Sequence, residues 1–172
     1  MKWLARILLA ILILVVLAFA VGAALPREHT AAVRVELNAP PESVYAAIAD
    51  VARSADWRED VSAVEVLSGD PLRWRETASW GTLTFERAAA DPHRRLVHRI
   101  DDAGEPFGGT WTYDVASSGV GTTLTITEDG WVSNPVFRLM SRFVFGHYST
   151  LEAYGRDLAR RFGQEVAPVR VR

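Results

Sequence analysis

The most apolar part of the chain lies at its beginning. Ile7 to Leu25 form an uncharged, almost wholly aliphatic run that only Gly22 interrupts. As a helix this run extends about 28 Å at ~1.5 Å per residue, close to the ~30 Å hydrocarbon core of a bilayer. A helix that is apolar on every side over this length is typical of a membrane span. We therefore interpret residues 1–26 as a transmembrane anchor and residues 27–172 as one domain.

The flanks of this run indicate an orientation and leave one alternative open. Lys2 and Arg6 precede it, and basic residues favour the cytoplasmic side, which places the domain outside the cytoplasm. The alternative is a cleaved signal peptide, because Ala18-Phe19-Ala20 and Gly22-Ala23-Ala24 could both serve as cleavage sites. Signal peptides usually have a shorter apolar region, so we favour the anchor. Both interpretations export the domain.

The rest of the chain begins with alternating apolar and polar residues. Val33, Val35 and Leu37 show the period of a half-buried strand. Pro40-Pro41 ends it and opens a short helix, followed by a second one that ends near Trp57. Strand-like runs separated by turn residues then predict an antiparallel sheet with one covered face. These runs are Val61–Leu67, Leu72–Trp80, Thr82–Ala88, Arg95–Asp101, Thr110–Val115 and Thr122–Trp131.

The last periodic segment predicts one long helix over residues 135–162. Asn134 followed by Pro135 is typical of a helix start, and Gly163 of a helix end. We expect its apolar face to cover the sheet and the residues after Gly163 to form a tail. This face consists of Val136, Met140, Phe143, His147, Leu151, Tyr154, Leu158 and Phe162.

Composition excludes several kinds of function. The chain has no cysteine, which excludes disulfides and cysteine zinc sites, and its only lysine is Lys2, which excludes Schiff-base chemistry in the domain. Its formal net charge is −2, whereas nucleic-acid binding needs a basic surface. The four histidines lack metal-binding spacing, so we expect no metal site, and we expect no cofactor.

The order of these elements is that of a helix-grip fold, and two segments agree with it. "VELNAPPESVYAAIADVARSADW" (Val35 to Trp57) resembles the opening of the polyketide cyclase/dehydrase group in the START-like (SRPBCC) superfamily. "GTTLTITEDG" (Gly121 to Gly130) resembles its last strand, and the likeness spans about residues 32 to 162. The resemblance implies an α+β fold in which a curved antiparallel sheet of six to seven strands surrounds a long C-terminal helix. Members bind lipids, sterols, polyketides or plant hormones, and only some are enzymes.

A cavity between sheet and helix would be lined by one side of each strand. Our choice of side gives an aromatic-rich wall, as ligand pockets tend to have, although each residue also suits an ordinary core. The expected wall comprises Trp74, Glu76, Ala78, Trp80, Leu83, Phe85, Leu96, His98, Ile100, Trp111, Tyr113, Val115, Leu124, Ile126 and Glu128, with Met140, Phe143 and His147 from the helix.

Glu76, Glu128 and His147 are polar exceptions in this wall. A buried carboxylate costs several kcal/mol unless it is paired or protonated. Each glutamate therefore either contacts a ligand or transfers a proton, or else pairs with an arginine or points outward at a bulge. His147 and His98 are either ligand contacts or hydrogen-bonded core histidines. We expect Glu128 and His147 to lie near each other, where Gly146 removes side-chain volume.

Three functions fit these observations. We favour a membrane-anchored, non-catalytic domain that binds a hydrophobic small molecule or lipid, because such ligands partition into membranes and anchoring raises their local concentration. The second is a cyclase or dehydratase acting through Glu76, Glu128 or His147, but no acid–base pair has a defined geometry and we assign no catalytic residue. The third is a structural or interaction domain with a collapsed cavity. The sequence predicts no particular protein partner.

Overall fold

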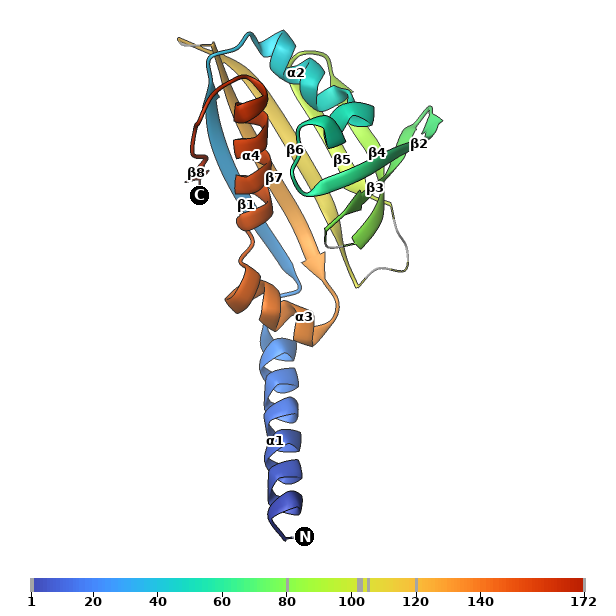
Figure 1. The fold of residues 1–172 in the computed structure, drawn as a ribbon, viewed down its shortest axis with the longest axis vertical. Coiled ribbons are helices and arrows are strands. Elements are labelled where there is room, and N and C mark those ends of the chain that lie inside the picture. The colour runs from blue at the N-terminus through green and yellow to red at the C-terminus, as the bar shows by residue number, and fades with distance from the viewer. Residues whose placement is uncertain (1, 80, 102–103, 105, 120, 172) are drawn as a thin grey trace.

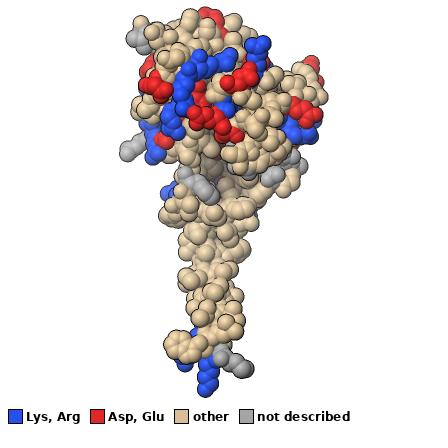
Figure 2. Space-filling view, in the orientation of Figure 1, with Lys and Arg blue, Asp and Glu red and all other residues tan. Residues whose placement is uncertain are grey.

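The computed structural model describes residues 2–79, 81–101, 104, 106–119 and 121–171, and it consists of an apolar helix attached to one end of a curved sheet (Figure 1). The helix, α1 (Lys2–Ala24), is long and apolar enough to cross a membrane, a property that signal sequences share. On the face shown in Figure 2, charged side chains cover the domain and the free end of α1, and almost none lie along the helix between them.

The sheet has eight antiparallel strands in the order β2-β3-β4-β5-β6-β7-β1-β8. Six of them, β2 to β7, follow one another as a meander, because the connections between them are too short for crossover helices. The strand count exceeds the predicted six to seven because part of the expected tail forms β8, which pairs with β1. The strands are β1 (Glu28–Leu37), β2 (Val61–Gly69), β3 (Leu72–Ala78), β4 (Gly81–Asp91), β5 (Arg95–Ile100), β6 (Phe107–Ser118), β7 (Gly121–Val132) and β8 (Val169–Val171).

Helices cover one face of this sheet, which confirms the helix-grip fold. The two predicted short helices are α2 (Pro41–Ala49) and a 3₁₀ helix, η1 (Val51–Asp56), and α4 (Ser149–Arg161) packs on β1 and β7. The core lies between them, where the apolar positions of β1 and β7 meet α4. Its fully buried members include Val33, Val35, Leu37, Leu124, Ile126, Leu151 and Leu158.

The C-terminal helical segment is broken, so the prediction of one long helix was wrong. It consists of α3 (Pro135–Met140), a π-helical turn η2 (Ser141–Phe145) and α4. Asn134 caps α3 as expected, accepting hydrogen bonds from two backbone N–H groups. Gly146 lies between η2 and α4 with a φ of 73°, a left-handed conformation that glycine adopts readily and that ends a helix.

Helix α3 lies against the last turns of α1 (Figure 1). Gly22 permits the close approach, since a methyl group there would overlap the backbone of Pro135. The buried Arg138 side chain donates from Nη1 to the carbonyl oxygens of Leu25 (2.8 Å) and Ala23 (3.4 Å). These carbonyls lie at the end of α1, where a helix has no internal donors for them. Helix α1 and the domain are therefore joined by packing and hydrogen bonds.

Candidate ligand-binding site

The inward face of the sheet carries the strand residues that the sequence assigned to a cavity wall. In β3, the buried Trp74 and Glu76 alternate with the exposed Arg75 and Thr77. The neighbouring strand β4 continues this inward face. Its Phe85 pairs with Trp74 and stacks on it with 5.7 Å between ring centroids. Trp80 lies outside the described residues. The other proposed site residues of the strands on this face are His98, Trp111, Tyr113 and Glu128.

Aromatic rings fill the centre of the space between sheet and helix. The His98 ring lies 4.8 Å from Trp74, edge to face, and 5.1 Å from Tyr113. Tyr154 of α4 completes the cluster, at 5.4 Å from Tyr113 and 5.8 Å from Trp111. Burial raises the pKa of Tyr113 and Tyr154, so both phenols stay neutral at physiological pH. A ligand at this level would contact these rings.

His98 contributes a polar atom to this aromatic cluster. Its Nε2 is buried and has no hydrogen-bond partner within the described part of the chain. Burial and the positive charges of Arg87 and Arg58 lower the pKa of His98 from its ordinary 6.5 to about 3. The ring is therefore neutral, and a neutral imidazole can bond to a hydroxyl or carbonyl group of a ligand.

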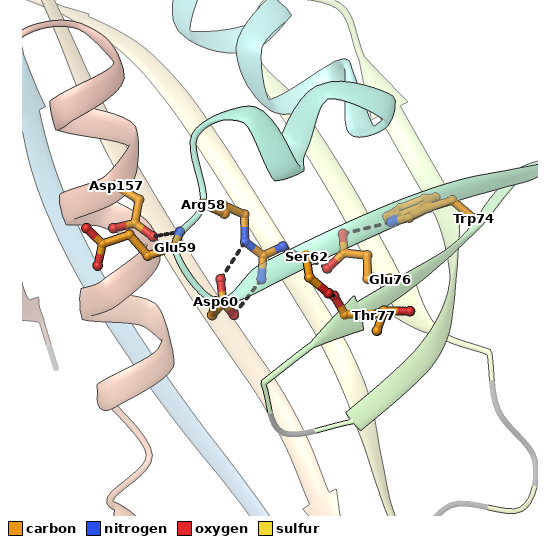
Figure 3. A network of polar contacts seen from close by, with 8 residues as sticks. All are labelled: Arg58, Glu59, Asp60, Ser62, Trp74, Glu76, Thr77 and Asp157. Carbon is orange, nitrogen blue, oxygen red and sulfur yellow. Dashed lines mark hydrogen bonds and ion pairs between the residues drawn. The ribbon is translucent and has the colours of Figure 1, made fainter.

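Glu76 is paired with Arg58, a residue that the sequence analysis did not single out (Figure 3). Arg58 Nη1 donates to Glu76 Oε2 at 2.8 Å, and Trp74 Nε1 donates to Glu76 Oε1 at 2.9 Å. Arg58 also donates to both carboxylate oxygens of Asp60, at 3.2 and 2.9 Å. Burial lowers the pKa of Arg58, but Glu76 and Asp60 raise it by more, so the guanidinium stays charged. Of the alternatives considered for Glu76, the structure therefore shows pairing with an arginine.

Glu128 and His147 lie at the same end of the sheet, with His29 between them. His29 Nε2 is 3.2 Å from Glu128 Oε1, and the rings of His29 and His147 stack with 4.0 Å between centroids. Burial and the charges of His29 and Arg142 lower the pKa of His147, whereas Glu128 acts in the opposite direction. A pocket of about 20 Å³, room for one water molecule, lies beside the two rings and next to Leu25.

The inward face is less covered at the end nearest α1. Farther along the strands Leu96 and Ile126 are fully buried, whereas Phe85, Ile100 and Trp111 are only half-buried. Strand pairing places the half-buried residues toward this end. Ile100 is the last residue of β5, and it lies near the start of β6 and the end of β7. The cause is the broken helix, since α4 begins only after Gly146. We call this region the open end of the domain.

Two residues predicted to line the cavity from the helix lie elsewhere. The Phe143 side chain is 69% exposed, so its assignment to the cavity wall was wrong. Met140 is half-buried at the end of α3, the helix that packs on α1. The turn at Gly146 explains both positions, because it directs residues 135–145 toward α1 instead of along the sheet.

The sequence matches, over residues 28–159, a family described as polyketide cyclase / dehydrase and lipid transport. A search of curated proteins gave no significant match.

Solved structures share the fold at low sequence identity. The di-domain ARO/CYC BexL from the BE-7585A biosynthetic pathway is 18% identical, with a TM-score of 0.64 over 82% of this chain and 52% of its own, so the chain spans about half of that protein. The Zhui aromatase/cyclase from Streptomyces sp. R1128 is 19% identical, with a TM-score of 0.59 over 79% and 92% of the two chains. A START superfamily protein from Mycobacterium smegmatis is 17% identical, with a TM-score of 0.62 over 80% and 98%.

Proposed function

Because the chain belongs to the polyketide cyclase/dehydrase and lipid transport family, we propose that it binds a hydrophobic small molecule or lipid between the sheet and α4 without converting it. The observation that supports this proposal is the open end, where Phe85, Ile100 and Trp111 point inward but are only half-buried. Apolar walls with a few polar groups are typical of sites for such ligands. His98 and Glu128 are the polar groups that would orient the ligand.

Residues 1–26 remain, in this proposal, as a transmembrane anchor, and residues 27–172 lie outside the cytoplasm. Lys2 and Arg6 support the orientation, and the open end then lies near the bilayer into which apolar ligands partition. The natural chain has no cysteine, so a single Leu67→Cys variant reports the location of the domain. A membrane-impermeant maleimide should label it in intact cells. N-terminal sequencing tests retention, and a mature start at Val21 or Leu25 would contradict the anchor.

Photocrosslinking tests ligand binding directly. The full chain is placed in vesicles that contain a phosphatidylcholine with a diazirine on its acyl chain, and crosslinked peptides are mapped by mass spectrometry. We expect crosslinks on inward positions of β4 to β6, and Trp111→Ala should reduce them. Leu67→Ala is the control, since Leu67 is an exposed apolar residue on the edge strand β2, outside the expected site. Crosslinks confined to α1 and its surroundings would refute binding inside the domain.

A second candidate function, a cyclase or dehydratase, is favoured by one observation. Arg58, Glu76 and His98 place charged and hydrogen-bonding groups inside an aromatic enclosure, where such groups act strongly on a bound molecule. This function predicts that a ligand recovered after incubation has changed, for example by the loss of one water. Mass spectrometry of the ligand before and after incubation distinguishes the two functions, and His98→Gln should abolish any such change.

A further inference from the structure

Large apolar side chains are exposed around the junction of the domain with α1. Outside α1, eight such residues are exposed in the described part of the chain, and five of them lie between residues 131 and 144. Phe143 and Val144 are the most exposed, at 69% each. The five are Trp131, Val136, Phe137, Phe143 and Val144. We propose that residues 131–144, named here the interfacial segment, are embedded in the lipid leaflet next to the domain; this inference rests on the proposed anchor.

The contact between α3 and α1 fixes the depth of this segment. Pro135, the first residue of α3, packs on Gly22, which precedes the end of the apolar run at Leu25 by three residues. At ~1.5 Å per residue, Gly22 lies about 4.5 Å inside the end of that run. If the run spans the hydrocarbon core, Pro135 is held at its boundary. The exposed side chains of the interfacial segment, which contains Pro135, then contact lipid.

The charges of the interfacial segment suit this position. It contains no acidic residue, and its two basic residues are Arg138 and Arg142. Arg138 is buried and bonded to the end of α1, whereas Arg142 is exposed and available to lipid phosphates. Phenylalanine together with arginine is typical of helices that lie in a membrane interface. On the face shown in Figure 2, the junction of α1 and the domain is largely uncharged.

Four backbone groups at this junction have side-chain partners. Arg138 bonds to the carbonyls of Ala23 and Leu25, and the Asn134 side chain accepts from the N–H groups of Val136 and Phe137. Polar backbone groups at helix ends need hydrogen-bond partners, and lipid provides none. These contacts are therefore compatible with a lipid environment.

Spin labels measure the depth of the segment in the intact protein. Single variants Phe143→Cys and Val144→Cys of the full chain are labelled and placed in phosphatidylethanolamine–phosphatidylglycerol vesicles. We expect the collision rate of both labels with oxygen to exceed that with a water-soluble nickel chelate severalfold. A label at Leu12 in α1 serves as the positive control and should show the same preference. The control is Leu67→Cys, an exposed apolar position on the edge strand β2, where the chelate should dominate.

The possible results distinguish the embedded segment from a contact between two copies of the chain, and from failure of the anchor or of ligand binding. The inference is overturned if labels at Phe143 and Val144 behave like Leu67 while the Leu12 label lies in the hydrocarbon. Mutual broadening of the Phe143 labels without oxygen preference would also overturn it, since a second copy of the chain would then cover the surface. An aqueous label at Leu12 would refute the anchor itself. Failure of lipid crosslinking inside the domain would refute only ligand binding.

Discussion

Replacing Glu76 by glutamine should destabilise the domain much more than the same change at Glu65. Both carboxylates accept a hydrogen bond from an arginine at 2.8 Å, Glu76 from Arg58 and Glu65 from Arg75. They differ in burial, since the Glu76 side chain is 6% exposed and that of Glu65 is 65% exposed. The comparison therefore isolates the effect of burial on an ion pair.

The structure sets the expected magnitudes. Glu76 accepts bonds from Arg58 and from Trp74, and a bond to a charged group contributes about 1.5–3 kcal/mol. Removing one partner of a buried pair costs about 3–5 kcal/mol, but Asp60 still neutralises Arg58 and glutamine can keep one bond. We expect the free energy of unfolding to fall by about 2–3 kcal/mol for Glu76→Gln. The exposed pair should contribute less than about 1 kcal/mol.

Urea titration of the full chain in detergent micelles, followed by tryptophan fluorescence, measures this difference. Micelles keep α1 helical, so the transition reports the unfolding of the domain. Equal losses for Glu76→Gln and Glu65→Gln would refute the reasoning, because they would show that burial adds nothing to the Arg58 pair. If the Glu76→Gln variant kept its full stability, that result would favour a ligand-binding role for this carboxylate.

Three further predictions concern His98, Gly22 and Glu128. The unfolded His98 binds a proton below its ordinary pKa of 6.5, whereas the folded ring does so only near 3, so stability falls as the pH drops through this range. His98 should account for about 2 kcal/mol of the loss between pH 7 and pH 5, and His98→Gln should remove that part of the slope in urea titrations. Gly22→Val should displace Pro135 and increase the mobility of a spin label at Phe137, whereas unchanged mobility would contradict the close packing of α3 on α1. Glu128→Gln should lower crosslinking to the diazirine lipid with little change in the urea midpoint; a loss of about 1–3 kcal/mol would instead assign the pair with His29 to stability.

Much of the fold could be predicted because its elements carry local signals. Alternation at Val33, Val35 and Leu37 correctly predicted a half-buried strand, and Asn134-Pro135 correctly predicted a helix start. The break at Gly146 could not be predicted, because the apolar spacing from Phe143 to His147 and Leu151 continues through it. Whether an isolated glycine stays helical or adopts a positive φ depends on tertiary packing that periodicity does not report.

The candidate site was less predictable, because its polar pairs join distant parts of the chain. Arg58 and Glu76 are 18 residues apart, and His29 and Glu128 are 99 residues apart. The strand pattern indicated that Glu76 and Glu128 point inward, but no local pattern specifies their partners. His29 carries no distinguishing local signal either, and it lies in β1, five residues after the end of α1.

The short connection between α1 and the sheet restricts where this domain can act. Only residues 25–27 separate Ala24 from Glu28, and Arg138 bonds to the backbone at this point, so the domain has to turn together with its helix. In a membrane, the open end would remain within about one domain diameter of the bilayer that holds α1. A carrier on a long flexible tether can deliver its cargo across a gap between two membranes, but this arrangement cannot. An acceptor would have to reach the same membrane surface, and lateral diffusion in the bilayer plane would then govern the rate of encounter.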